Sequence, residues 1–130
     1  MERQGGTNLI VVADDEQLVA DSTAEILRTR GFEAVSAHSG REAMELVLRL
    51  KPDILLVDVV MPDIDGVQIA IELCRTAPNC RIILFSGQTD TVDLLEQARR
   101  DGHEFEILAK PVHPEELLKT VSKPRPSSHS

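Results

Sequence analysis

Four apolar runs in this sequence of 130 residues each end on side chains that carry a charge or a hydroxyl group. The runs and their terminal residues are 9–13 with Asp14 and Asp15, 53–58 with Asp58, 81–86 with Ser86, and 105–110 with Lys110. Carboxylates bind cations, whereas hydroxyl and ammonium groups donate hydrogen bonds to anions. Carboxylates held close together repel each other by about 4 kcal/mol at an effective dielectric constant of about 20. The adjacent pair at positions 14 and 15 therefore needs a compensating charge or exposure to water.

The apolar runs predict the strands of a buried parallel sheet. Five strands are expected, at residues 9–13, 34–37, 53–58, 81–86 and 105–110, of which 34–37 carries the weakest signal. Three of the runs are nearly continuous in Ile, Leu and Val, which is typical of strands that are covered on both faces.

Amphipathic stretches between these runs predict helices. The expected helices cover residues 16–30, 40–50, 66–76 and 90–101, and a last one begins in the segment HPEELL at 113–118. In the first helix, the residues expected on the buried face are Leu18, Val19, Ser22, Ile26 and Leu27. Gly31 is expected to end that helix.

Polar residues mark the starts of two expected helices. Ser39 and Glu42 can form a capping box at the start of the second helix. Asp63 and Asp65, in the segment MPDIDG, are interpreted as turn and helix-start residues rather than as metal ligands. Gly66 in the same segment is expected to permit a tight backbone path.

Predicted strands and helices alternate five times along the chain. This order indicates an α/β fold of the doubly wound kind, a five-stranded parallel sheet flanked by five helices on both faces. The carboxyl ends of parallel strands lie at one edge of the sheet, where open α/β sheets bind ligands. Each polar strand end by itself is more often a helix cap or a turn. Their coincidence predicts a site with three carboxylates, one hydroxyl and one ammonium group on one rim.

The composition fits one domain, since the hydrophobic fraction of 42% is sufficient for a core. A net charge of −8 and only three Phe as aromatic residues argue against nucleic-acid binding. No apolar run approaches the roughly 20 residues that span a bilayer, and the N-terminus does not resemble a signal peptide. We therefore expect a cytoplasmic protein that does not associate with a membrane. Residues 1–7 are expected to be disordered, 8–122 to form the domain, and 123–130 to be a disordered tail or linker. Cys74 and Cys80 are expected to be reduced thiols.

Four segments together resemble the receiver domain of two-component response regulators, of the chemotaxis-regulator type. The segments are ADDE (13–16), LLVDVVMPDIDG (55–66), FSG (85–87) and LAKP (108–111). The resemblance covers about residues 8–121 and implies a (βα)5 flavodoxin-like fold. It also implies that a sensor histidine kinase or a phosphotransfer protein donates a phosphoryl group to this chain. Such a domain catalyses its own phosphorylation and slow dephosphorylation, and it is not a turnover enzyme.

The resemblance implies a role for each polar residue of the rim. Asp58 would be the phosphoacceptor. The Mg²⁺ ligands would be Asp15, Asp58 and the backbone carbonyl of Val60, with Asp14 holding a metal-bound water. Lys110 would pair with one phosphate oxygen, and the Ser86 hydroxyl would donate to another. With Mg²⁺ bound, the three carboxylates and the lysine would leave the site neutral before the phosphoryl group arrives.

The sequence departs from the receiver pattern at one position. Many receivers place an aromatic residue three positions before the lysine, where this chain has Ile107. Phe105 and His103 are the alternatives for that switch role, because the register of this segment is open. A β-branched Ile can bury its methyl groups in either backbone state. We therefore predict that the switch runs through Ser86 and the loop 87–90, without a side-chain flip at residue 107.

The resemblance also implies an output surface formed by the fourth helix, the fifth strand and the fifth helix. An output domain, a target protein or a second copy of the domain would dock there, with candidate contacts in 91–107. A flavodoxin-like cofactor binder is disfavoured because the loop after the first strand is acidic and lacks glycine. A metal-dependent phosphatase is disfavoured because DVVMPD lacks a D-x-D pair. A receiver-like module that has lost phosphorylation is disfavoured because all the acidic, hydroxyl and lysine residues of the rim are present. The sequence leaves open whether the chain is a stand-alone receiver or one domain of a longer protein.

Overall fold

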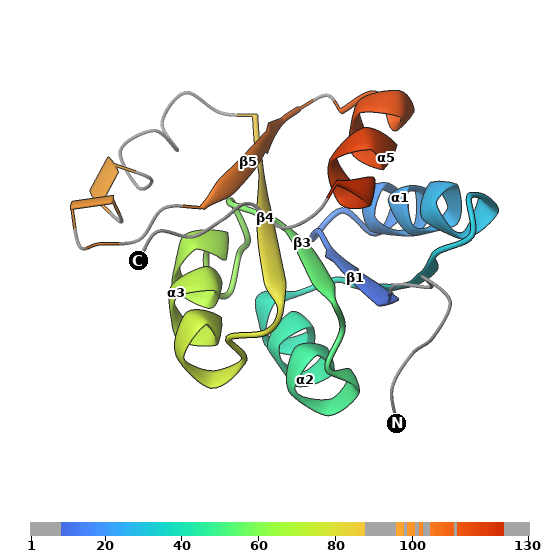
Figure 1. The fold of residues 1–130 in the computed structure, drawn as a ribbon. Helices are drawn as coiled ribbons and strands as arrows, with labels where there is room; N and C mark the ends of the chain where they lie inside the picture. The colour runs from blue at the N-terminus through green and yellow to red at the C-terminus, as the bar shows by residue number, and fades with distance from the viewer. Residues whose placement is uncertain are drawn as a thin grey trace.

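Five strands form one parallel sheet in the order β2-β1-β3-β4-β5 (Figure 1). The structure is a computed structural model that describes residues 9–87, 96–97, 99–100, 102, 105–110 and 112–123. The strands are β1 (Leu9–Ala13), β2 (Glu33–Ala37), β3 (Ile54–Asp58), β4 (Arg81–Ser86) and β5 (Glu106–Ala109). Each strand lies within one residue of its predicted bounds.

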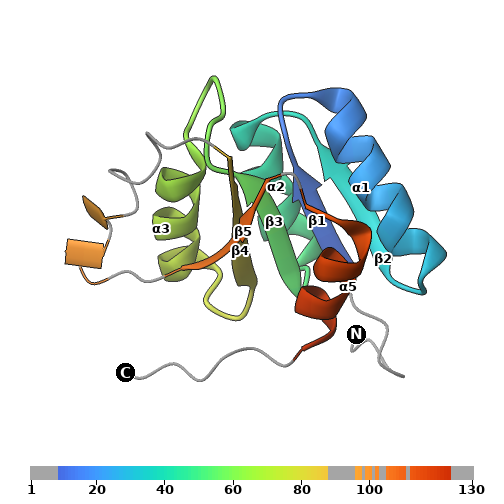
Figure 2. The same ribbon diagram turned by 90° about the horizontal axis from the view of Figure 1, so that it is seen from above.

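Helices cover both faces of this sheet. The described helices are α1 (Gln17–Thr29), α2 (Gly40–Leu50), α3 (Gly66–Thr76) and α5 (Pro114–Ser122). Helices α1 and α5 lie on one face, and α2 and α3 lie on the other (Figures 1 and 2). The predicted doubly wound α/β fold is therefore confirmed.

Parts of the predicted organisation lie outside the described residues. They are most of the helix expected at 90–101, the N-terminal segment, and all of the predicted tail except Lys123. Within the described part of the chain, no helix is long and apolar enough to cross a membrane. Cys74 is exposed and Cys80 is buried.

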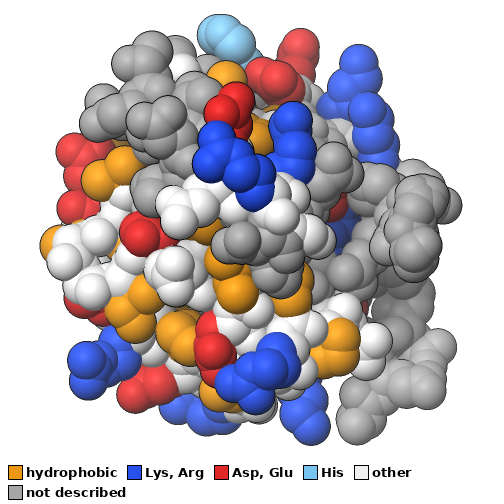
Figure 3. Space-filling model, turned by 90° about the vertical axis from the view of Figure 1, so that its left-hand side faces the viewer, with side chains coloured by type: hydrophobic (Ala, Val, Ile, Leu, Met, Phe, Trp, Pro, Cys, Tyr) orange, Lys and Arg blue, Asp and Glu red, His pale blue; other side chains and the backbone are white. Residues whose placement is uncertain are grey.

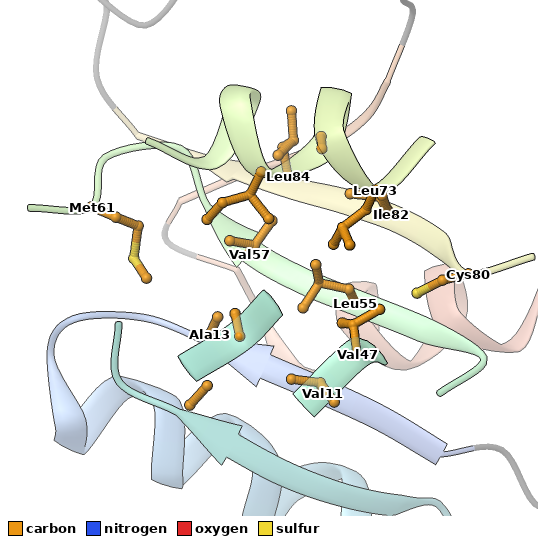
Figure 4. Packing of buried hydrophobic residues seen from close by; sticks show 14 of the residues in the cluster. Val11, Ala13, Val47, Leu55, Val57, Met61, Leu73, Cys80, Ile82 and Leu84 are labelled. Atoms are coloured by element: carbon orange, nitrogen blue, oxygen red, sulfur yellow. The ribbon is translucent and has the colours of Figure 1, made fainter. Parts of the chain in front are cut away.

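Alternate residues of the central strands build two apolar layers. Val11 and Leu55 are fully buried in the layer under α2 and α3 (Figure 4). Ile10 and Leu56 are fully buried in the opposite layer, under α1 and α5. Complete burial of each such side chain contributes about 2 kcal/mol. Because both faces of β1 and β3 are covered, the residues at the carboxyl ends of these strands are held in defined positions.

The prediction for the buried face of helix α1 is partly wrong: Leu27 is buried and Val19 and Ile26 are half-buried as expected, but two alanines share this face. Ala20, Ala24 and Leu27 are buried. Leu18, expected in the core, is instead 77% exposed, and Ser22 is exposed as well. Two alanines on the inner face let the helix lie close to the strands beneath it. The prediction made from the spacing of the larger apolar residues is therefore wrong about which side of the first helical turn faces the sheet.

The helix ends follow the predicted signals with one difference. Gly31 has a φ of 95°, a conformation that favours glycine. The Ser39 hydroxyl accepts a hydrogen bond from the Glu42 backbone N–H at 3.1 Å. The Glu42 carboxylate accepts from the backbone N–H of His38 at 2.9 Å, not from Ser39 as in the predicted capping box. Helix α2 therefore still has a side-chain cap at its first turn.

Candidate functional site

Three carboxylates meet at the carboxyl ends of β1 and β3. Asp14, Asp15 and Asp58 each offer one oxygen, and the three oxygens lie within 4.8 Å of one another. In the register of the two strands Ala13 pairs with Val57, so the next residues along both strands are neighbours. Asp14 is 1% exposed and Asp58 is 8% exposed, whereas Asp15 lies in solvent. The predicted convergence of the acids is therefore present.

Hydrogen bonds made by the backbone and by the side chain of Asp14 hold this residue at the rim. Its backbone N–H donates to the Ala37 carbonyl of neighbouring β2 at 3.1 Å. Its Oδ1 accepts from the Glu16 backbone N–H at 2.9 Å. The second oxygen, Oδ2, is the one that faces the side chain of Lys110.

The ammonium group of Lys110 bridges the two buried carboxylates. Its Nζ donates to Asp58 Oδ2 at 2.8 Å and to Asp14 Oδ2 at 3.1 Å. The Lys110 backbone N–H donates to the Ser86 carbonyl at 3.0 Å, which seats the lysine beside the end of β4. The residue is 96 positions from Asp14 and 52 from Asp58 in the sequence. Only the parallel order of β1, β3, β4 and β5 brings these groups together.

Burial and the ion pairs act in opposite directions on the pKa values of this pair. Burial raises the pKa of Asp58 above its ordinary value of 3.8, although the Lys110 hydrogen bond and charge work against that rise. Burial alone would lower the pKa of Lys110, but the hydrogen bonds and charges of Asp58 and Asp14 outweigh it and raise that pKa. Asp58 is therefore a carboxylate that is costly to keep ionised without a further cation.

The donor set fits a hard divalent cation. Carboxylate oxygens are the ligands that such ions prefer. The three carboxylates and the single ammonium group leave a local charge of −2, which one divalent ion would neutralise. Asp14, Asp15 and Asp58 can therefore hold a metal ion, and among the described residues this is the one such cluster.

Asp63 and Asp65 lie outside the acidic cluster and cap helices, as interpreted from the sequence. The Asp65 carboxylate accepts from the Gln68 backbone N–H at 2.8 Å at the start of α3. Asp63 instead accepts from the backbone N–H groups of Gly40 and Arg41, at the start of α2. The sequence carries no local signal for this second contact, because its partners are 23 and 22 residues away.

Gly66 lies directly against the backbone of Asp58. A Cβ atom at this position would lie 2.3 Å from the Asp58 carbonyl oxygen and 2.9 Å from the Val59 Cα. The Gly66 N–H donates to the Val59 carbonyl at 2.7 Å and closes the loop between β3 and α3. The expected tight path is confirmed, and its reason is contact with the backbone of Asp58.

Val60 follows the end of β3, and Ser86 is the last residue of β4. The Val60 backbone N–H donates to Asp58 Oδ1 at 3.2 Å, and the Val60 side chain is 51% exposed. Ser86 ends β4 and is half-buried. A Cβ at Gly87, the next residue, would lie 3.0 Å from the Lys110 Cβ. The backbone after β4 therefore passes close to the lysine stem.

Comparison with known proteins decides the family. The sequence matches the response regulator receiver domain over residues 10–122. The chain belongs to this family. It is 37% identical over 115 residues to the transcriptional regulatory protein PdtaR of Mycobacterium tuberculosis, covering 86% of this chain and 54% of that protein. It is 29% identical to the chemotaxis protein CheY of Thermotoga maritima, covering 88% of this chain and 94% of that protein.

Solved receiver domains share the fold. A CheY-like receiver domain from Methanospirillum hungatei superposes with a TM-score of 0.81 at 23% identity, covering 89% of this chain and 91% of that one. The chain described in Figure 1 covers 54% of PdtaR, about half of its length, but 94% of the Thermotoga maritima chemotaxis protein.

The residue three positions before Lys110, at which the sequence departs from the receiver pattern, is a half-exposed isoleucine. Ile107 is 47% exposed and pairs in register with Leu84 of β4. Phe105 is partly buried against the layer formed with α2 and α3, and His103 lies outside the described residues. Figure 3 shows the side of the molecule to the left in Figure 1, where apolar side chains lie among charges of both signs. The predicted switch route through Ser86 and the loop 87–90, without a flip at residue 107, stays a prediction, and residues 88–90 lie outside the described part of the chain.

Proposed function

We propose that this receiver domain accepts a phosphoryl group on Asp58 in a reaction that depends on Mg²⁺. The carrying observation is the Lys110 Nζ, which bridges Asp58 Oδ2 and Asp14 Oδ2 beside a third carboxylate. This arrangement supplies a nucleophile, a cation site and a second positive charge at one point. Phosphoryl transfer depends mainly on such positioning and charge stabilisation.

Membership of the receiver family implies a role for each residue of the site. A carboxylate oxygen of Asp58 attacks phosphorus, an O–P bond forms, and the bond between phosphorus and the donor atom breaks, leaving its electrons on the donor. Asp15, Asp58 and the Val60 carbonyl would hold Mg²⁺, with Asp14 acting through a water. The ion would supply positive charge to the oxygens of the transferring group. Lys110 exchanges its Asp58 bond for a phosphate oxygen, and the Ser86 hydroxyl donates to another.

The donor that best suits this site is a phosphohistidine of a sensor kinase or of a phosphotransfer protein. The product is a modified receiver and not a released compound, so the domain is not a turnover enzyme. A kinase of this kind would meet the domain in the cytoplasm. The modified state would change docking of an output domain, a target protein or a second copy at the β5–α5 side.

Labelling with a small phosphodonor tests the assignment. Incubation with acetyl phosphate and Mg²⁺ should add one acid-stable, base-labile phosphate, measured by intact mass, and EDTA should abolish it. Asp58→Asn should remain unlabelled. Asp21→Asn, which removes an exposed carboxylate of α1, is the matched control and should label like the wild type. Labelling of Asp58→Asn would refute the proposal.

The route of the switch has its own test. Beryllofluoride, which mimics the phosphoryl group, should shift amide signals in β5 of the wild type. Ser86→Ala should greatly reduce that shift with Mg²⁺ binding retained, because a ligand shifts two states only through contacts that differ between them. Ile107→Val should leave the shift nearly unchanged. The opposite pattern would assign the switch to residue 107.

A further inference from the structure

Asp63 connects the loop that follows Asp58 to the start of helix α2. One carboxylate oxygen accepts from the Gly40 backbone N–H at 2.9 Å, and the other accepts from the Arg41 N–H at 3.0 Å. The first N–H groups of a helix have no partner within the helix. The loop between β3 and α3 therefore supplies part of the cap of a different helix.

The loop and the helix fit together without spare room. Gly40 is buried, and a Cβ there would lie 2.9 Å from Ile69 Cδ1, 3.0 Å from the Ile64 carbonyl oxygen and 3.2 Å from Asp63 Oδ1. A Cβ at residue 40 would therefore displace the end of the Ile69 side chain and press on the loop backbone at Ile64. The Asp63 contact therefore joins the loop to α2 beside a closely packed region, although the Asp63 side chain itself is exposed.

Helix α2 has a second cap that does not involve the loop. The Ser39 hydroxyl accepts from the Glu42 N–H at 3.1 Å. Asp63 and Ser39 thus serve different N–H groups of the same helix end, and only Asp63 belongs to the loop. Hydrogen bonds from Gly40 and Arg41 lower the pKa of Asp63 below its ordinary value, so it holds the joint as a carboxylate at neutral pH.

The segment held by this joint carries Val60. On its N-terminal side, Val59 is buried and its N–H donates to the Phe85 carbonyl at 3.0 Å. Met61 is buried next to Val60, and Asp63 then ties the segment to α2. Val60 itself is half-exposed, and its N–H reaches Asp58 Oδ1. The position of the Val60 backbone therefore depends on anchors on both sides of it.

We propose that Asp63 is a positioning residue for the metal site, because it fixes the Val60 backbone by seating the β3–α3 loop on the N-terminus of α2. The inference rests on the proposed function, in which the Val60 carbonyl is a metal ligand. Loss of a supporting contact behind a metal ligand weakens metal binding by about 10- to 100-fold. Asp63 acts through backbone three residues away, so the lower end of that range is expected.

The experiment compares two variants that each remove one cap of α2. Asp63→Ala removes the loop joint, and Ser39→Ala removes the cap that has no link to the loop. Both should lower the melting temperature in EDTA. Mg²⁺ affinity is measured by calorimetric titration, and exchange of the Val60 amide hydrogen in metal-free protein by NMR. Asp63→Ala should weaken Mg²⁺ binding about tenfold and speed Val60 exchange, whereas Ser39→Ala should change neither.

A conservative variant keeps the test decisive if Asp63→Ala unfolds. Asp63→Asn retains one acceptor oxygen for two donors, so its Mg²⁺ affinity should fall between those of the wild type and Asp63→Ala. Equal affinities and equal Val60 exchange in the Asp63 variants and Ser39→Ala would overturn the positioning role, with the proposed function intact if the wild type binds Mg²⁺ and is labelled. A wild type that neither binds Mg²⁺ nor accepts phosphate would overturn both.

Discussion

Replacement of Asp58 by Asn should stabilise the metal-free receiver domain. The change keeps the shape of the side chain and removes one negative charge from a place where three carboxylates meet. Lys110 keeps its bond to Asp14 at 3.1 Å. The variant cannot be phosphorylated if Asp58 is the acceptor. The substitution therefore measures the effect of the Asp58 charge on stability separately from phosphorylation.

The distances in the cluster determine the expected magnitude. With a dielectric constant of about 20, the attraction between Asp58 and Lys110 at 2.8 Å is about 6 kcal/mol. The repulsions from Asp14 and Asp15, at no more than 4.8 Å, are each at least about 3.5 kcal/mol. Solvent screening reduces the repulsion from exposed Asp15, so the repulsions roughly offset the attraction, and the burial of an ionised carboxylate remains. We expect a gain of about 1 kcal/mol, or about 4 °C in melting temperature for a domain of this size.

The effect should depend on pH with a definite sign. Burial places the folded-state pKa of Asp58 above the ordinary value of 3.8. The folded protein therefore holds this proton more tightly than the unfolded chain. The wild type loses stability as pH rises from the unfolded pKa through the folded pKa, and the deficit is complete above that window. The advantage of Asp58→Asn should thus be largest at neutral pH and should vanish near the unfolded pKa.

Thermal unfolding in EDTA and in saturating Mg²⁺ is the assay, at neutral pH and at about pH 4. Mg²⁺ stabilises the form that binds it by about 2.7 kcal/mol at a concentration 100 times the Kd, so it should reverse the order of wild type and variant. Glu45→Gln removes an exposed charge from α2 and controls for the net charge. An equal gain in Glu45→Gln, or a variant less stable than wild type in EDTA, would refute the reasoning.

Three further substitutions test contacts that hold the site and the sheet. Lys110→Ala leaves two buried carboxylates without their cation and should lower the free energy of unfolding in EDTA by about 2 kcal/mol; an unchanged urea midpoint would contradict this. Gly66→Ala must displace the Asp58 backbone, so it should cost about 3 kcal/mol and reduce acetyl phosphate labelling measured by mass; normal labelling would show that the backbone accommodates a Cβ. Arg81→Ala breaks a two-point pair with Glu106 and bonds to the carbonyls at the end of α5; it should cost about 3 kcal/mol and speed hydrogen exchange in α5, and slow exchange there would contradict it.

Local patterns in the sequence were sufficient for the elements and for the rim. Runs of Ile, Leu and Val marked the strands because a strand buried on both faces needs apolar side chains at successive positions. Asp14, Asp58, Ser86 and Lys110 were placed at one edge because parallel strands end at the same side of their sheet. The family segments then suggested roles for residues whose positions the pattern had already constrained.

Orientation within an element was beyond the sequence pattern. The first turn of α1 was misjudged, since Leu18 is exposed and the helix lies on the sheet through Ala20 and Ala24. How far a helix rotates depends on which small residues allow it to approach its neighbours, and this is a property of two surfaces. The exposure of Ile107 is likewise decided by what packs on β5.

Contacts between distant segments were decided only by the tertiary structure. Asp63 shows no sequence signal that distinguishes a cap of α2 from an ordinary turn residue, because its partners are more than 20 residues away. The sequence predicts that Lys110 pairs with a phosphate oxygen. In the folded protein its ammonium group is already hydrogen-bonded to two carboxylates. The sequence determines which groups stand at each strand end through local periodicity. Their pairings depend on strand order, register and burial, which exist only once both faces of the sheet are covered.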